Sequence, residues 1–123
     1  MTNSGKIGEV FAARYLVQKG YKIIGANYRT RFGEIDIIAE NSEYIIFVEV
    51  KTRSVDSIAN PRESVDARKQ AKIIKATEQY LASYSPTLQP RFDVIEVITQ
   101  IGEPPKLKEI HHIENAFMGS SYH

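Results

Sequence analysis

The sequence predicts a single α/β domain with elements in the order α-β-β-β-α-β-β. Two segments with helical periodicity are separated by apolar, strand-like runs, and polar or proline-containing turns separate these runs. A length of 123 residues suits one domain of ordinary size. With 42% hydrophobic and 25% charged residues, the composition is that of a globular protein and not of a disordered one.

The first helix is predicted over residues 4–19, where Asn3 or Ser4 can cap the start and Gly20 can end it. Its apolar face is expected to consist of Ile7, Val10, Phe11, Leu16 and Val17. A strand follows over residues 21–31, and Gly25 allows a bulge within it.

A hairpin is predicted next, with strands over 34–40 and 43–52 and a two-residue turn at Asn41-Ser42. This turn would set Asp36 opposite Phe47 and diagonal to Glu49. Alternation along strands then places Glu34, Asp36, Glu49 and Lys51 on one face. The other face would collect Ile35, Ile37, Ile46, Val48 and Val50 as core. A three-residue turn would break this agreement, so the register rests on the apolar pattern.

The rest of the chain completes the α/β order. Residues 53–64 are predicted to be a loop, and the second helix to run from an N-cap at Asp66 to about Tyr84. Strands are expected over 91–99 and 108–113, with a turn at 102–105 between them. The last few residues are expected to fray.

Composition excludes several classes of site. The chain contains no cysteine, which excludes disulfides and thiolate metal sites. It has no apolar run of the roughly 18 residues that a membrane helix requires, and no signal-peptide core, so we expect a cytoplasmic protein. No Ser/His/Asp set, glycine-rich phosphate loop or zinc-ligand spacing is present.

Charge is distributed unevenly along the chain. Residues 1–31 carry six bases and one acid, residues 34–49 carry five acids and no base, and residues 51–75 carry seven bases and three acids. An acidic strand pair between basic segments could hold a cation beside a polyanion. Unevenly placed surface charge is the alternative.

The predicted hairpin carries more carboxylates than Lys51 can neutralise. Two carboxylates about 4 Å apart repel by roughly 4 kcal/mol at an effective dielectric of about 20. The surplus must be hydrated, protonated, paired with Arg29 or Arg31, or neutralised by a bound cation. Hard oxygen ligands favour Mg²⁺ or Mn²⁺, whereas a structural salt-bridge network is the alternative.

Asp36 followed by Glu49-Val50-Lys51 on the next strand resembles the D…(D/E)xK signature of the restriction-endonuclease-like, PD-(D/E)xK nuclease superfamily. The proline that often precedes the signature Asp is Ile35 here. The chain is more closely similar to the YraN-like family of uncharacterised bacterial proteins. The residues that carry this resemblance are Gly8-Glu9, Asn27-Tyr28-Arg29, Gly33-Glu34-Ile35-Asp36, Phe47-Val48-Glu49-Val50-Lys51-Thr52-Arg53, Lys69-Gln70, Arg91-Phe92-Asp93-Val94 and Asn115-Ala116-Phe117.

The resemblance extends to archaeal Holliday-junction resolvases and implies a mixed central sheet flanked by helices. It implies that Asp36 and Glu49 bind Mg²⁺ or Mn²⁺ together with the Val50 carbonyl, and that Glu9 reaches the metal directly or through water. Lys51 would orient or deprotonate the attacking water in a metal-assisted phosphodiester hydrolysis. A homodimer is expected by the same analogy.

Further candidates flank these residues. Gln70 precedes the core stripe of the second helix by three and four residues, so it faces the sheet, and the resemblance implies that it positions phosphate or water. Lys69 beside it, and Arg29, Arg31 and Arg53, could bind phosphates. Each arginine could equally pair with a local acid, and Lys69 could belong to a solvated helix face.

Three functions follow from the sequence. The first is a metal-dependent nuclease that acts on DNA, including branched or single-stranded DNA. The second is a nuclease-fold module that binds nucleic acid without cutting it. The third is a structural or interaction protein whose charges only stabilise the fold. The presence of all four of Glu9, Asp36, Glu49 and Lys51 favours the nuclease.

Overall fold

The computed structural model describes residues 4–55, 65–84 and 87–117, and its elements follow the predicted order. The residues at 56–64, and those expected to fray after 117, lie outside the described part. The elements are α1 (Ser4–Gln18), β1 (Lys22–Arg29), β2 (Glu34–Glu40), β3 (Tyr44–Ser54), α2 (Ala67–Ser83), β4 (Gln89–Gln100) and β5 (Lys106–Phe117). None of the described helices is long and apolar enough to cross a membrane.

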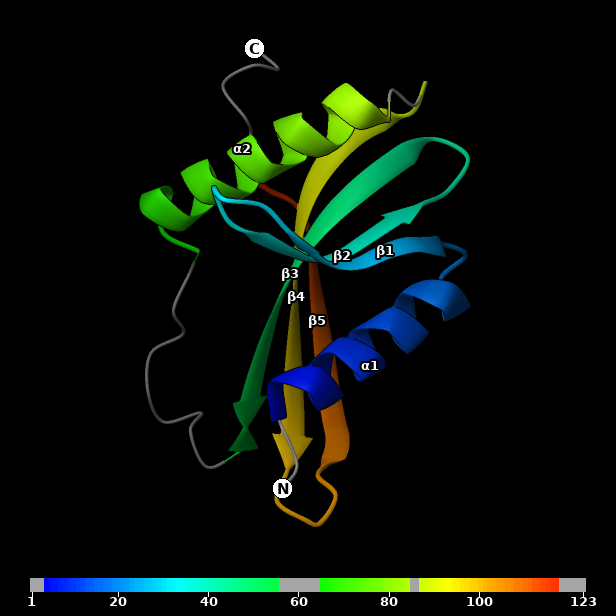
Figure 1. Ribbon diagram of the computed structural model, residues 1–123. Coiled ribbons are helices and arrows are strands. Elements are labelled where there is room, and N and C mark those ends of the chain that lie inside the picture. Colours follow the sequence, from blue (N-terminus) through cyan, green and yellow to red (C-terminus); the bar gives the residue numbers. More distant parts are fainter. Residues whose placement is uncertain (1–3, 56–64, 85–86, 118–123) are drawn as a thin grey trace.

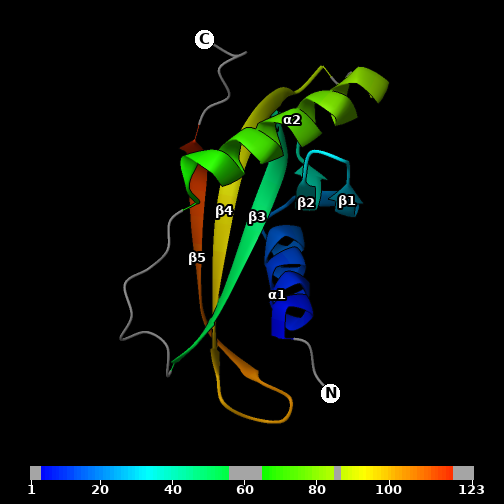
Figure 2. The ribbon, with the colours of Figure 1, turned by 60° about the vertical axis from the view of Figure 1, so that its left-hand side comes forward.

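The five strands form one mixed sheet in the order β1-β2-β3-β4-β5 (Figure 1). Only β3 and β4 are parallel, and α2 lies between them in the chain, as a parallel connection requires. In Figures 1 and 2, α2 lies near the upper end of the sheet and α1 near its lower end. This is the single-domain, nuclease-like α/β arrangement that the resemblance implies.

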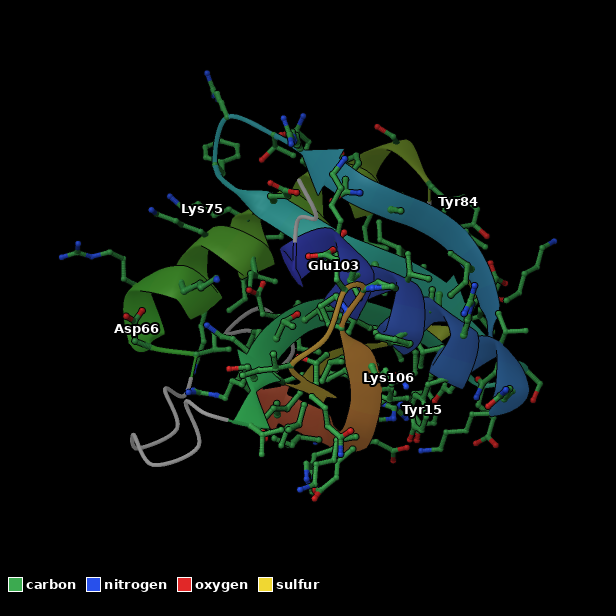
Figure 3. All side chains as sticks on the ribbon, turned by 90° about the horizontal axis from the view of Figure 1, so that it is seen from below. Tyr15, Asp66, Lys75, Tyr84, Glu103 and Lys106 are labelled. Atoms are coloured by element: carbon green, nitrogen blue, oxygen red, sulfur yellow. The ribbon has the colours of Figure 1, made fainter. Side chains whose placement is uncertain are left out.

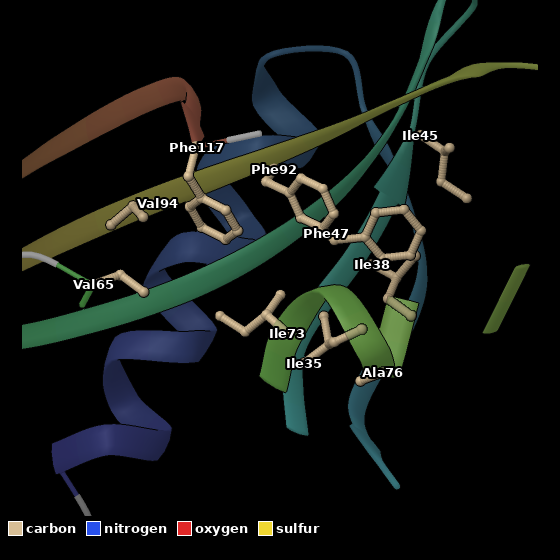
Figure 4. Close-up of a cluster of buried hydrophobic side chains, with 10 residues drawn as sticks. All are labelled: Ile35, Ile38, Ile45, Phe47, Val65, Ile73, Ala76, Phe92, Val94 and Phe117. Atoms are coloured by element: carbon tan, nitrogen blue, oxygen red, sulfur yellow. The ribbon is translucent and has the colours of Figure 1, made fainter. Parts of the chain in front are cut away.

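Each helix packs on its own hydrophobic cluster. Beside α2 the cluster contains Phe47 of β3 and Phe92 of β4 together with Ile73 and Ala76 of the helix (Figure 4). Beside α1 it contains Ala12 and Leu16 with strand residues of β2, β3 and β4. Apolar burial on both faces explains why the central strands are almost continuously hydrophobic.

The predicted apolar face of α1 is partly wrong. Val10 and Val17 are 49% and 57% exposed, whereas Ala12 and Leu16 are fully buried. The buried stripe begins at Gly8, where an added Cβ would lie 1.8 Å from Thr52 Oγ1 of β3. Small residues therefore set the orientation of α1, because they let its backbone approach the sheet closely.

The hairpin register is shifted by two residues from the predicted one. Ile38, not Asp36, lies opposite Phe47, because Glu40 pairs with Ile45 and leaves four residues, 41–44, between the first paired positions instead of two. The Asn41 side chain accepts from the N–H groups of Glu43 (2.9 Å) and Tyr44 (2.8 Å), which stabilises the longer turn. A shift of two keeps the paired residues 37–40 and 45–48 on their predicted faces, so the predicted alternation holds where β2 and β3 pair.

Ile35 also departs from the prediction. Its neighbour on the expected core face, Ile37, packs in the cluster beside α1, whereas Ile35 packs in the cluster beside α2. The pairing of β2 with β3 ends at Ile37–Val48, while β2 continues to pair with β1 through Ile35 and Glu34. The strand therefore changes its neighbours at Asp36.

The remaining predicted boundaries lie close to the observed ones: β1 is shorter than predicted, whereas β3, β4 and β5 are extended. Asp66 caps α2 by accepting from Lys69 N at 2.8 Å, and Tyr84 follows the last turn. The bulge expected in β1 lies between Ile23 and Gly25. Arg53 and Ser54, expected in a loop, extend β3. The final strand is longer than expected, since it ends at Phe117, which stacks on Phe92 at 4.9 Å.

A buried ionic network ties β4 and β5 together. Asp93 is completely buried and accepts from Arg91 through both carboxylate oxygens, each at 2.8 Å, and from Asn115 N at 3.0 Å. His112 Nε2 lies 2.7 Å from the same carboxylate. These partners outweigh burial and lower the pKa of Asp93. His112 of β5 thus helps to hold that strand beside Asp93 of β4.

Candidate active site at the fork between β2 and β3

The candidate site lies where β2 leaves β3. Continuing the observed register past Ile37–Val48 sets Asp36 opposite Glu49. No backbone pairing of β2 with β3 is present there, and the Val50 N–H instead donates to Asp36 Oδ2 at 2.8 Å. Because N–H and C=O of one strand residue point to the same side, the Val50 carbonyl also points into this fork.

Glu49, which the continued register sets opposite Asp36, is 6% exposed. Its Oε1 is 2.5 Å from Lys69 Nζ, which reaches it from the first turn of α2. Burial lowers the pKa of Lys69, but the hydrogen bond and charge of Glu49 outweigh it and leave that pKa raised. The pair therefore joins α2 to the sheet at the candidate site.

Glu9 enters from α1, next to the close contact of Gly8 with Thr52. With its amide nitrogen turned toward the carboxylates, Asn27 donates to Glu9 Oε1 (3.1 Å) and Glu34 Oε1 (3.2 Å). The Asn27 backbone has φ of 52°, a left-handed conformation that Asn tolerates better than most residues. Asn27 thus holds Glu9 and Glu34 together at the rim of the site.

The electrostatics of the fork are dominated by negative charge. Burial and then the charge of Glu49 raise the pKa of Asp36 to about 7, against the opposing effect of the Val50 hydrogen bond. Glu9 and Glu34 add to this increase. The pKa of Glu9 is itself raised, by burial and by the charge of Glu34. An added positive charge here would relieve the repulsion.

The donors at the fork fit a hard divalent cation with few protein ligands. Among the described residues, no three His, Cys, Asp or Glu side chains lie close enough together to hold one metal ion. Mg²⁺ needs fewer, since it is usually bound by one or two carboxylates and keeps several waters. Asp36, Glu49 and the Val50 carbonyl match that pattern, and Glu9 would then act through water.

Lys51 and Gln70 lie beside this group. Lys51 follows Val50 on β3, pairs in register with Glu96 and has the side chain of Lys69 as a neighbour. The Gln70 amide donates through Nε2 to the Val65 carbonyl at 2.7 Å, next to the start of α2. That bond fixes the side chain at the end of the helix nearest the fork.

The three arginines are placed differently. Arg53 Nε lies 3.5 Å from the buried Glu96, and its side chain is only 16% exposed. Arg29 is 79% exposed and lies 3.6 Å from Glu34. Arg31 is exposed and lies over the ring of Phe32. Of the three, Arg53 is therefore the least accessible to a ligand.

Comparison with known proteins identifies the family. The model of the family described as Uncharacterised protein family UPF0102 matches residues 8–97. The chain belongs to the UPF0102 family. The YraN-like resemblance is thereby confirmed, and the matched part of the UPF0102 chain runs from Gly8, beside Glu9, to Val97 in β4.

UPF0102 proteins from several bacteria are similar over nearly the whole chain. One from Caldanaerobacter subterraneus subsp. tengcongensis is 47% identical over 114 residues, which cover 92% of this chain and 93% of the relative. One from Alkaliphilus oremlandii is 50% identical over 116 residues, covering 92% and 96%. One from Chlorobium phaeobacteroides is 45% identical over 117 residues, covering 93% of each.

Asn27 is a residue of the UPF0102 site that its spacing in the sequence did not indicate. A polar Asn inside a strand pattern is a weak signal, because Asn is depleted in strands and tolerated in the left-handed region. The pairs on either side, Ala26–Ile37 and Tyr28–Ile35, set it opposite Asp36. Its backbone conformation and its contact with Glu9 could be found only in three dimensions.

Proposed function

We propose that this UPF0102 protein is a cytoplasmic, divalent-metal-dependent nuclease that hydrolyses DNA phosphodiester bonds. The observation that carries the proposal is the group of carboxylates at the fork. Glu9, Asp36 and Glu49 come from three different elements, and their mutual repulsion contributes to a pKa of about 7 for Asp36. A bound divalent cation would remove that repulsion, and negative substrate could then approach.

Each residue has a role in the proposed reaction. Asp36, Glu49 and the Val50 carbonyl would hold Mg²⁺ or Mn²⁺, which would supply a Lewis acid and activate water. In the structure Glu49 pairs with Lys69; with a metal bound, Glu49 would be its ligand and Lys69 would be available to bind phosphate. Lys51 would orient the attacking water and stabilise the developing negative charge. The water's proton would pass to surrounding water as the new P–O bond forms, and the leaving oxygen would take a proton from water as its bond to phosphorus breaks. Gln70 and Glu9 position water around this group.

The test is a cleavage assay with Mg²⁺ or Mn²⁺ on duplex, single-stranded, flapped and four-way DNA. We expect cleavage by the parent, with a preference for branched substrates, and at least a 100-fold loss in Lys51→Ala, on the scale of a positioned acid or base. Lys22→Ala, an exposed lysine on β1, is the matched control and should cut normally. An Asp36→Ala protein that cuts as well as the parent would reject the proposal.

One observation favours a second candidate, a nuclease-fold module that binds nucleic acid without cutting. The ammonium of Lys69 already neutralises Glu49, so the fold balances part of its own charge without a metal. Divalent-metal binding in calorimetry with no cleavage of any substrate would support this candidate. The expected homodimer is checked in the same preparations by sedimentation equilibrium.

A further inference from the structure

The outer face of α2 carries cations next to the candidate site. Arg68, Lys72 and Lys75 recur at spacings of four and three, and all three are exposed. Residues 67–77 contain four bases and no acid, the fourth base being Lys69 at Glu49. This spacing places the three exposed side chains on one stripe of the helix. The neighbouring stripe contains Lys69, which contacts Glu49 at the fork.

The turn between β1 and β2 reaches this stripe. An added Cβ at Gly33 would lie 3.0 Å from Lys72 Cβ, so the turn backbone lies directly against the helix. Thr30 holds the turn closed, since its Oγ1 accepts from Phe32 N (3.0 Å) and Gly33 N (3.2 Å). Figure 3 shows Lys75 on the side of α2 that this turn approaches.

Phe32 gathers two cations from different elements. Arg31 Cζ lies 4.9 Å and Lys75 Nζ 5.5 Å from the centre of its ring, within the range of cation–π contacts. Arg31 and Lys75 are both exposed, so their remaining N–H donors face water. The ring thus holds two like charges near each other at the surface, an arrangement that an anion would stabilise.

Ordinary surface charge explains this group poorly. Like charges three and four residues apart on a helix are mildly destabilising, and such pairs are usually relieved by acids. Within the described residues, Arg68, Lys72 and Lys75 form no ion pair. Glu78, three residues after Lys75, lines a surface hollow with Phe32, Lys75 and Gln79.

We infer that Arg31, Arg68, Lys72 and Lys75, positioned in part by Phe32, form a track for the phosphate backbone of the DNA substrate. This inference rests on the proposed nuclease function and specifies how the substrate is held. Arg68 to Lys75 spans about 10.5 Å along the helix, roughly the axial rise of three nucleotides. Such contacts fix register and orientation without reading bases, so binding is independent of sequence.

The test measures anisotropy of a labelled single strand and a labelled duplex in EDTA, across about 50 to 200 mM salt. The Lys72→Ala/Lys75→Ala variant should bind at least 10-fold more weakly, and its slope of log affinity against log salt should be shallower by about 1.5 to 2. Phe32→Leu leaves the charge unchanged and should cost about 2- to 5-fold in affinity.

The matched control is Lys106→Ala/Lys108→Ala, which removes two exposed lysines from β5, away from α2 (Figure 3). It should bind like the parent. Parental affinity and salt slope in Lys72→Ala/Lys75→Ala, or an equal loss in the control, would overturn the track. A helical circular-dichroism spectrum and melting point like the parent's exclude misfolding of the variants.

Failure of the track is separable from failure of the proposed function. A parent that cuts DNA while Lys72→Ala/Lys75→Ala binds normally would reject the track alone. A parent that binds through the track but never cuts with any divalent metal would reject the nuclease alone.

Discussion

Asp36→Asn tests the electrostatics of the fork without any substrate. Asp36 has a pKa of about 7 in the fold against 3.8 as the ordinary value, a difference of about three units. At about 1.4 kcal/mol per unit this corresponds to about 4 kcal/mol, which solvent access to the half-buried side chain reduces to about 2–4 kcal/mol. The amide of Asn can still accept from Val50 N–H through Oδ1.

The sign follows from proton binding. Between pH 3.8 and about 7 the folded state holds the Asp36 proton more tightly than the unfolded state, so this contribution to stability falls as pH rises and is fully lost above about 7. Asp36→Asn cannot ionise at this position, so its stability does not fall in this way as pH rises. Its free energy of unfolding should gain about 2–4 kcal/mol relative to the parent between about pH 4 and about pH 9.

Urea unfolding followed by circular dichroism, at low salt and in EDTA, measures the difference between the two proteins at each pH. Glu43→Gln, an exposed acid in the β2–β3 connection, is the control and should run parallel to the parent. Parallel curves for Asp36→Asn and the parent would refute the reasoning, because burial and the neighbouring carboxylates would then not raise the pKa of Asp36 in the fold.

Three further substitutions test the surrounding structure, each by its free energy of unfolding. Asp93→Ala should cost about 3–5 kcal/mol, because it leaves the largely buried Arg91 without its carboxylate, and a loss below about 1 kcal/mol would contradict the network. Gly8→Ala should cost about 1–3 kcal/mol through its clash with Thr52, and Thr52→Ala should relieve part of this in the double variant; additive losses would argue against the contact. Asn27→Ala should be about 1–2 kcal/mol less stable than Asn27→Gly, since only the former strains the left-handed backbone; equal stabilities would dismiss that strain.

Local chemistry made much of the fold predictable. The Asp66 cap, the bulge at Gly25 and the alternation where β2 and β3 pair follow from short-range rules, and the structure follows them. The hairpin register was wrong by two residues, because Asn41 stabilises a longer connection than its sequence suggested. Because side chains alternate with a period of two, a shift of two residues does not change the predicted face of Asp36 and Glu49.

Contacts across space account for what the sequence could not predict. Apolar character at Val10 and Val17 indicated a buried face, but Gly8 and Ala12 pack closer because they are small. The partner of Glu49 is Lys69, twenty residues further along the chain, and periodicity carries no information about such a pair. The same limit applies to Asn27 and Glu9, whose contact depends on where α1 docks.

The hydrogen bond from Val50 to Asp36 has a practical consequence for experiments in solution. The Val50 N–H donates to the Asp36 carboxylate at a place where the pairing of β2 with β3 has ended. The chemical shift of its proton therefore depends directly on that carboxylate. Its resonance should move as Asp36 titrates near neutral pH, and again when a cation takes the carboxylate. The Val50 amide resonance would therefore report cation binding at Asp36 without any substrate in the sample.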